Sequence, residues 1–223
     1  MIDNLRGDLI KINKLEDLYK DYYASAFRYL KAKGIYTPGF VWGCGDVDAK
    51  AVLIGEAPGR DEVDKGIPFA GKAGGILDEF ISCTSCKRDE MFITNTIKYR
   101  LSRPRKNYES SLSGVIPNKD LANRPATIGE VCVAAAYLKK ELEILEPEFI
   151  VTLGNTPLKA VFTAFFSDET VPPVSAVRGK PIPVPAIRGA YLYPVFHPAS
   201  LIYTPGNAPL YKADLLNLAS MIR

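Results

Sequence analysis

The sequence is poor in the residues from which metal and redox sites are usually built. It has one histidine among 223 residues, His197, which excludes any site that needs several histidines. It has four cysteines without an export signal before them, so free thiols or metal ligands are favoured over disulfides. They are Cys44, Cys83, Cys86 and Cys132. Cys83 and Cys86 form the single pair CTSC, which is either a redox or metal element or two incidental surface thiols.

Long apolar runs are also missing. A membrane-spanning helix needs about eighteen or more apolar residues, and no such run is present. The first residues, MIDNLRGDLI, are polar and charged rather than typical of a signal peptide. We therefore expect a soluble, cytoplasmic protein without a membrane partner. Its net charge of +3 is too small to indicate a nucleic-acid partner and does not oppose one.

Apolar patterns typical of strands and helices alternate along the chain. With 47% hydrophobic and 24% charged residues the composition is globular, so we expect one domain over residues 1–223. Within 1–40 we expect a helix over 9–33 and a connection. Strands are predicted at 51–54, 91–97, 148–154 and 190–196, and further helices at 75–82, 127–145, 156–166 and 210–222. The alternation predicts a three-layer α/β/α fold around a central, mostly parallel, four-stranded sheet.

Several polar residues follow the predicted strands at the point where each strand ends. They are Glu56, Asn95, the pair Gly154 and Asn155, and His197. In parallel sheets ligands bind at the carboxyl ends of the strands. We therefore expect side chains suited to recognition and to acid-base chemistry to meet at one edge.

The stretch 52–75, VLIGEAPGRDEVDKGIPFAGKAGG, carries the clearest local signals. Glu56 lies in a Gly-Glu-Ala-Pro-Gly loop, and loop glycines allow a ligand to approach the backbone. Phe69 follows a proline and adds an aromatic ring, which predicts a pocket for a flat, polar molecule. Part of the stretch is close to a phosphate-binding loop, but Ala73 replaces the Ser or Thr that would hold magnesium, so nucleotide hydrolysis is disfavoured.

The segment 98–124 is strongly basic, with seven Lys or Arg against two acids. Its prolines, serines and asparagines predict a long loop, which forms an insertion over 101–122. Two interpretations stay open, a mobile solvated insertion and an arm that contacts phosphates. After it, Thr127 and Glu130 have the spacing of a helix capping box.

Five motifs occur in the same order as in the uracil-DNA glycosylase superfamily, and most closely resemble its family 4. They are GEAPGRDEVDKGIPFAGKAGGILD, ITNTIKYR, NRPAT, IVTLGN and VFHPASLI. The resemblance runs from Val41 to about Leu218 and is interrupted by an extra loop at roughly 103–122. It implies a monofunctional glycosylase that hydrolyses the N-glycosidic bond of uracil in DNA, in base excision repair, and a monomeric protein. The alternative is a non-catalytic nucleic-acid-binding member of the same fold, and a thiol redox role through CTSC is a distant third.

The resemblance also implies a role for each residue of the site. Phe69 stacks on the flipped base, and Asn95 reads the N3-H and O4 edge of uracil. His197 faces O2, where negative charge develops, and Glu56 orients or deprotonates a water. Gly55 and Ala57 complete the substrate contacts. DNA contacts are expected from Arg100, Arg103, Arg105, Lys106, Ser200 and Leu201, with Leu201 and its neighbour Ile202 either an apolar wedge or part of the core.

The chain departs from the family at the cysteines that hold its iron-sulfur cluster. Two of those cysteines would fall near Arg28 and Lys31, and Tyr99 occupies the place of a third. Only Cys132 stands where a family ligand stands, so four thiolate ligands cannot assemble there. We therefore expect no metal and no cofactor.

Overall fold

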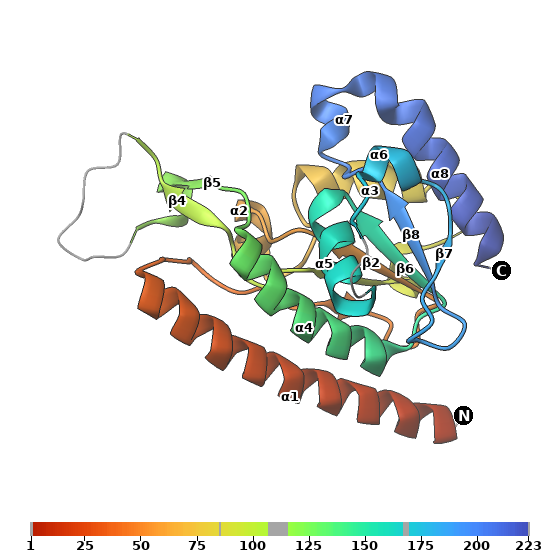
Figure 1. Ribbon diagram of the computed structural model, residues 1–223, viewed down its shortest axis with the longest axis horizontal. Helices are drawn as coiled ribbons and strands as arrows, with labels where there is room; N and C mark the ends of the chain where they lie inside the picture. The colour runs from red at the N-terminus through yellow and green to blue at the C-terminus, as the bar shows by residue number, and fades with distance from the viewer. Residues whose placement is uncertain (1, 85, 107–115, 167–169, 223) are drawn as a thin grey trace.

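The computed structural model describes residues 2–84, 86–106, 116–166 and 170–222 (Figure 1). Its centre is a six-stranded sheet with the order β1-β3-β2-β6-β8-β7. The four inner strands run parallel and are β2 (Ala51–Gly55), β3 (Phe92–Asn95), β6 (Phe149–Leu153) and β8 (Tyr191–Val195). The predicted mostly parallel sheet is confirmed. Two antiparallel edge strands extend it, β1 (Cys44–Gly45) and β7 (Ile182–Pro183), which are too short to leave a pattern in the sequence.

Helices cover both faces of this sheet. On one face lie α4 (Ile128–Leu145), α5 (Asn155–Phe165) and the short α6 (Val174–Val177), and α1 (Ile2–Lys33) runs along α4 (Figure 1). On the other face lie α3 (Lys72–Ile81) and α8 (Ala208–Met221). Among the described residues, no helix has the length and the apolar character needed to cross a membrane.

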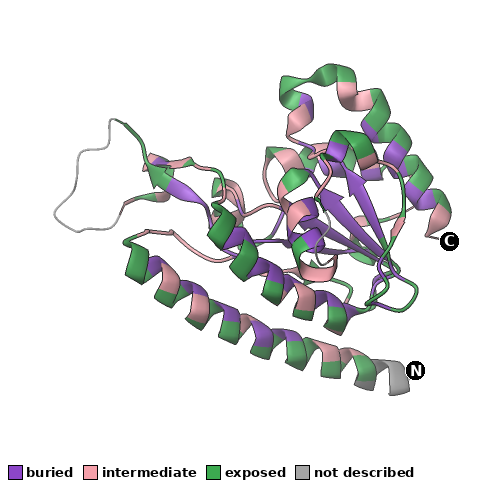
Figure 2. Ribbon diagram, viewed as in Figure 1, coloured by how far each residue is buried: buried purple, intermediate pink, exposed green. Residues whose placement is uncertain are grey.

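The sheet is buried on both sides, as Figure 2 shows for its inner strands. In β2, Val52 and Ile54 pack in the cluster on the α4 side, whereas Leu53 packs in the cluster on the α3 side. Burying a side chain of this size stabilises the fold by about 1.5 to 3 kcal/mol, so both layers contribute. Because both faces are covered, the strands read as continuous apolar runs.

The insertion differs from the predicted long loop at its two ends. There β4 (Ser102–Pro104) pairs antiparallel with β5 (Leu121–Asn123), after the 3-10 turn η2 (Asn118–Asp120), and 107–115 lie outside the described residues. The guanidinium of Arg100 holds this β4–β5 pair together. It donates to Asn123 Oδ1 at 3.0 and 3.2 Å and to the Leu121 carbonyl at 3.2 Å.

Short elements complete the connections. They are α2 (Arg60–Lys65), η1 (Arg88–Glu90), α7 (Ser200–Tyr203) and η3 (Pro205–Asn207). The predicted capping box is confirmed at the start of α4: the Thr127 hydroxyl accepts from the Glu130 amide, and the Glu130 carboxylate accepts from the Thr127 amide.

Candidate active site

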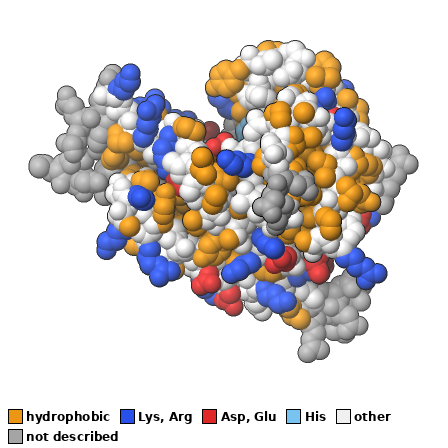
Figure 3. Space-filling view, in the orientation of Figure 1, with side chains coloured by type: hydrophobic (Ala, Val, Ile, Leu, Met, Phe, Trp, Pro, Cys, Tyr) orange, Lys and Arg blue, Asp and Glu red, His pale blue; other side chains and the backbone are white. Residues whose placement is uncertain are grey.

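The carboxyl ends of the parallel strands meet at one edge, as predicted. Gly55 at the end of β2 pairs with Asn95 at the end of β3, and His197 follows β8. A pocket of about 420 Å³ opens at this edge, between the β2–α2 loop, the strand β5 and the segment after β8. It is lined by Glu56, Ala57, Pro58, Gly59, Leu101, Asn123, Arg124, Pro125 and His197. Figure 3 shows this face hollowed between the β4–β5 pair and α7, with Lys and Arg side chains gathered over the β4–β5 side.

Phe69 and Asn95 form the buried end of the site. They are 3% and 2% exposed, and neither belongs to the open wall of the pocket. Both lie against Gly55, where a Cβ atom would clash with Asn95 Oδ1 and lie 2.7 Å from a ring carbon of Phe69. Glycine at position 55 therefore allows the carboxamide and the ring to meet.

The carboxamide of Asn95 carries an unsatisfied donor. Its Nδ2 atom is buried and has no hydrogen-bond partner among the described residues. A buried polar atom without a hydrogen-bond partner lowers the stability of the fold by about 1 to 3 kcal/mol, so its presence suggests a function. A ligand oxygen at this position would supply the missing acceptor.

Phe69 is held in an unusual backbone conformation by its neighbours. Its φ of 54° lies in the left-handed region, which costs a non-glycine residue about 1 to 3 kcal/mol. Glu62 Oε1 accepts from the Phe69 amide at 2.7 Å, and the other carboxylate oxygen accepts from the Gly59 amide. Arg88 donates to the carbonyls of Pro68 and Phe69 at 3.0 and 3.3 Å. These contacts hold the backbone that carries the ring.

His197 is a neutral hydrogen-bond donor. Burial lowers its pKa from 6.5 to about 4, so the imidazole is uncharged at neutral pH. Its Nδ1 atom accepts from the Ala199 amide at 3.1 Å, which leaves the ring proton on Nε2. Behind the ring, Gly154 has a φ of 97°, and a Cβ atom there would lie 3.1 Å from the Cβ of His197. The glycine thus permits both the turn and the close approach.

Glu56 is half-buried in the wall that it shares with His197. Its backbone carbonyl accepts from the Ile97 amide at 3.0 Å, which fixes the loop to the end of β3. Its Oε1 atom accepts from the Ala126 amide at 3.3 Å. One long hydrogen bond leaves the carboxylate able to accept from a water molecule in the pocket.

The residues expected to contact DNA occupy different environments. Arg103, Arg105 and Lys106 are exposed at the β4–β5 pair, whereas Arg100 is 4% exposed and is engaged in holding that pair. Ser200 donates to the His197 carbonyl at 2.7 Å.

Leu201 of α7 is 8% exposed and packs in the core, which supports the packing interpretation for this residue. Its neighbours Ile202 and Tyr203 are 50% and 85% exposed. They are the apolar residues that α7 presents to solvent.

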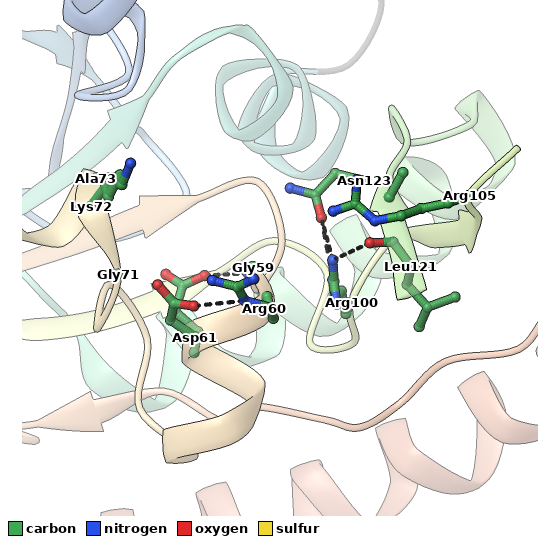
Figure 4. Close-up of a pocket in the computed structure, with 12 residues that line it drawn as sticks. Gly59, Arg60, Asp61, Gly71, Lys72, Ala73, Arg100, Arg105, Leu121 and Asn123 are labelled. Atoms are coloured by element: carbon green, nitrogen blue, oxygen red, sulfur yellow. Dashed lines mark hydrogen bonds and ion pairs between the residues drawn. The ribbon is translucent and has the colours of Figure 1, made fainter. Parts of the chain in front are cut away.

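A second pocket, of about 410 Å³, adjoins the first and shares Gly59 and Asn123 with it (Figure 4). We call it the basic pocket, because its lining includes Arg60, Lys72, Arg100 and Arg105. In Figure 4, Arg60, paired with Asp61, lies across the pocket from Arg100 and Arg105. Burial lowers the pKa of Arg100, and the nearby Arg60 lowers it further. Asp61 and Glu62 also line the pocket, so four cationic side chains face two carboxylates, and the remaining positive charge favours an anion.

The residues present do not fit the four-thiolate cluster of the family. Tyr99 is buried, and its hydroxyl donates to Glu130 Oε1 at 2.9 Å, while Arg124 lies 2.6 Å from the same oxygen. Cys132 is exposed on α4. Within the part of the chain that the structure describes, no three His, Cys, Asp or Glu side chains are grouped so that they could hold a metal ion.

Sequence reasoning missed two supporting residues of the site. Glu62 was not recognised as the residue that supports Phe69, although its spacing of three residues from Gly59 is that of a capping box and was the available signal. Arg124 entered only as part of the NRPAT motif. Its place on the pocket wall depends on its bond to Glu130, six residues further along the chain.

Comparison with known proteins identifies the family of this chain. The family model described as uracil DNA glycosylase superfamily matches residues 42–219. The chain is 33% identical over 192 residues to a type-4 uracil-DNA glycosylase of Archaeoglobus fulgidus, covering 86% of this chain and 84% of the relative. It is 33% identical over 167 residues to one of Thermotoga maritima, covering 75% and 73%, and 30% identical over 175 residues to one of Sulfurisphaera tokodaii, covering 78% and 70%. This chain therefore belongs to the uracil DNA glycosylase superfamily.

Proposed function

We propose that this protein is a monofunctional uracil-DNA glycosylase, which hydrolyses the N-glycosidic bond of uracil in DNA during base excision repair. The observation that carries the proposal is the unpartnered, buried amide of Asn95 beside the ring of Phe69. The neutral imidazole of His197 and the carboxylate of Glu56 line the pocket next to them. The names of the relatives support the same reaction.

Recognition of the base rests on Asn95 and Phe69. A carboxamide offers a donor and an acceptor side by side, so Nδ2 donates to uracil O4 and Oδ1 accepts from N3-H. Taking the base out of the stack costs a few kcal/mol, and stacking on an aromatic ring returns about 1 to 3 kcal/mol. Gly55 and Ala57 leave space for the base at the loop.

Cleavage transfers the electron pair of the glycosidic bond to N1 of uracil, and the negative charge spreads to O2. The Nε2-H of His197 donates to O2, and a donor aimed at a developing oxyanion contributes about 3 to 4 kcal/mol. Since the imidazole is neutral, it donates a hydrogen bond and does not need to give up its proton.

The sugar becomes positively charged as the base leaves. Glu56 stabilises that charge and accepts a proton from the water whose oxygen bonds to C1′ of the sugar. Ala57 stands next to it, so the site has one carboxylate at this point of the loop. The products are free uracil and an abasic site in the strand.

The DNA strand runs from the β4–β5 pair across the mouth of the pocket toward α7. Arg103, Arg105 and Lys106 contact phosphates on one side, and the basic pocket receives a phosphate next to the flipped nucleotide. Arg100 holds the β4–β5 pair in place for these contacts. On the other side Ser200 keeps the loop after β8 in shape.

The oligomeric state, the localisation and the domain organisation are also part of the proposed function. We propose that the protein acts as a monomer in the cytoplasm on uracil-containing DNA, with residues 1–223 as one domain. The packing of α1 against α4 supports the single domain.

The test uses single-stranded and double-stranded oligonucleotides with one uracil, followed by alkaline cleavage at any abasic site. We expect cleavage at uracil and none at thymine in the matched oligonucleotide. Glu56→Gln should lower the rate by about a hundredfold or more while DNA binding persists, because the general base is lost. Binding without release of uracil by the parent protein would instead favour the non-catalytic alternative.

A further inference from the structure

A buried ion pair lies directly behind the base-reading strand end. Lys98 Nζ is 2.6 Å from Glu141 Oε2, and the two side chains are 3% and 1% exposed. Neither residue contacts the pocket, and the proposed chemistry uses neither. Transferring two charges from water to the protein interior costs about as much free energy as their attraction returns. The buried pair is therefore better explained by a role other than stability.

The lysine also reaches back to the strand that carries Asn95. Its ammonium donates to the backbone carbonyl of Asn95 at 2.7 Å and to Thr94 Oγ1 at 2.5 Å. With Glu141, these contacts use all three of its donors. The geometry of the ammonium is therefore fully determined.

The carboxylate connects this arrangement to two helices. Glu141 belongs to α4, and its Oε1 atom accepts from the Tyr19 hydroxyl of α1 at 2.6 Å and from Thr94 Oγ1 at 3.1 Å. Burial lowers the pKa of Lys98, and the carboxylate of Glu141 opposes that shift. The end of β3 is thereby connected to α1 and α4.

The Asn95 side chain has no comparable support of its own. Its Nδ2 atom is unpartnered among the described residues, so protein hydrogen bonds to that atom do not set the direction of the carboxamide. The direction must come from the backbone of the strand end and from packing against Gly55 and Phe69. The backbone carbonyl of Asn95 is the group that Lys98 holds.

We propose that Lys98, fixed by Glu141, is a positioning residue for Asn95, which it orients for base recognition through the Asn95 carbonyl. The proposal rests on the proposed function. Lys98 fills space in the core and also donates to the Asn95 carbonyl. An apolar side chain of similar size could fill the same space but could not donate. Stability and positioning can therefore be tested apart.

The test is the double variant Lys98→Met/Glu141→Gln, which removes both charges, retains side chains of similar size and leaves an acceptor for Tyr19. Replacing a buried pair by neutral groups of similar volume often leaves stability unchanged, so the thermal midpoint should stay close to that of the parent. We expect kcat/KM for uracil excision to fall by about tenfold to a hundredfold, mainly through kcat, as a misplaced recognition group does. Discrimination between uracil and cytosine should fall with it.

The matched control is Arg178→Met/Asp214→Asn, at a second poorly exposed pair with an N–O distance of 2.6 Å. Removing that pair should leave base discrimination unchanged. A loss of discrimination as large as in the Lys98 variant would show general loosening of the fold and overturn the proposal.

A second measurement does not depend on catalysis. In protein with isotope-labelled asparagine, the side-chain amide resonance of Asn95, assigned by its disappearance in Asn95→Asp, should shift or broaden in the double variant. An unchanged resonance in the double variant would overturn the positioning role. Failure of the parent protein to release uracil would count against the proposed function only, because the resonance is measured without catalysis. If the double variant does not fold, Glu141→Gln by itself is subjected to the same measurement, with the same two outcomes.

Discussion

The ring of Phe69 and the imidazole of His197 lie 6.0 Å apart between centroids, with their planes inclined by 30°. Phe69 comes from the connection between α2 and α3, and His197 from the segment after β8. Aromatic pairs at this separation attract each other by about 0.5 to 1.5 kcal/mol. The contact joins the residue proposed to hold the base to the residue proposed to receive its charge, so the two are arranged relative to each other before DNA arrives.

The pH dependence of excision should reflect a histidine that is neutral over an unusually wide range. Because burial lowers the pKa of His197 to about 4, activity should show no inflection near 6.5 and should fall as the pH falls through about 4. Protonation of Nδ1 there breaks the bond from the Ala199 amide. Single-turnover rates across this range are the measurement. An inflection near 6.5 that disappears in His197→Gln would contradict the prediction.

Glu130 should contribute to stability in a defined pH window. Burial raises the pKa of Glu130, but hydrogen bonds from Arg124, Thr127 and Tyr99 outweigh burial and bring it to about 2. The folded pKa is below the ordinary 4.5, so this stability is present above 4.5 and is lost as the pH falls toward 2.

Glu130→Gln should therefore lower the free energy of unfolding at pH 7 by about 3 kcal/mol, since it removes the charge that pairs with the half-buried Arg124 from a fully buried carboxylate position. Urea unfolding of this variant, with the exposed Glu143→Gln of the same helix as the control, measures the difference. An equal loss of unfolding free energy in Glu130→Gln and Glu143→Gln would show that Glu130 contributes no more to stability than an exposed glutamate.

Asn95→Asp should change which base is released. A carboxylate accepts from the N4 amino group of cytosine but cannot donate to uracil O4. Uracil excision should fall by about one to two powers of ten, because an unpaired buried edge costs roughly 1 to 3 kcal/mol, while cytosine excision becomes detectable. His197→Ala should slow both bases alike. Full uracil activity in Asn95→Asp would mean that Asn95 does not read the base.

The salt dependence of DNA binding should identify the basic arm. Each phosphate contact adds about 0.7 to 0.9 to the slope of log affinity against log salt, so Arg103→Gln/Arg105→Gln should flatten it by about one to two units. Substitution is preferable to deletion of the segment, because Leu101 and Leu121 at its ends are buried. The control is Lys14→Gln/Lys20→Gln on α1. An equal change of slope in the two double variants would mean that the insertion is solvated and does not contact phosphates.

The protein should be colourless and should bind no stoichiometric iron. Tyr99 is bonded to Glu130 where the family resemblance would place a thiolate, and Cys44, Cys83 and Cys132 are exposed. Replacing all four cysteines by serine should leave the excision rate within about twofold of the parent, because three are exposed and the half-buried Cys86 lies outside the pocket. Visible absorption with iron and sulfide analysis provides the measurement, and a brown protein whose colour is lost in the cysteine-free variant would contradict it.

Much of the fold was predictable because the sheet is buried on both faces. Continuous apolar runs mark β2, β3, β6 and β8, and the residues that follow them mark the functional edge. The antiparallel edges β1 and β7 have two residues each and no periodicity. The β4–β5 pair was missed for another reason, since its strands have three residues each and are supported by Arg100, a side chain outside both strands.

The site also has a part that was predictable from the sequence and a part that was not. The location of Glu56, Phe69, Asn95 and His197 at one edge of the sheet was predictable, because it follows from strand ends and motifs. Their support was not, since it consists of contacts between segments far apart in the sequence. Lys98 and Glu141 are 43 residues apart, and nothing in either local pattern connects them.

The bonds among Tyr99, Glu130 and Arg124 have one more consequence. They join the segment after β3, the start of α4 and the pocket wall through a phenol, a carboxylate and a guanidinium. None of these groups takes part in the stepwise oxidation that converts a thiolate to sulfenic and sulfinic acids. The integrity of this wall therefore depends on the protonation state of Glu130 in strong acid and not on the redox state of a thiolate at position 99.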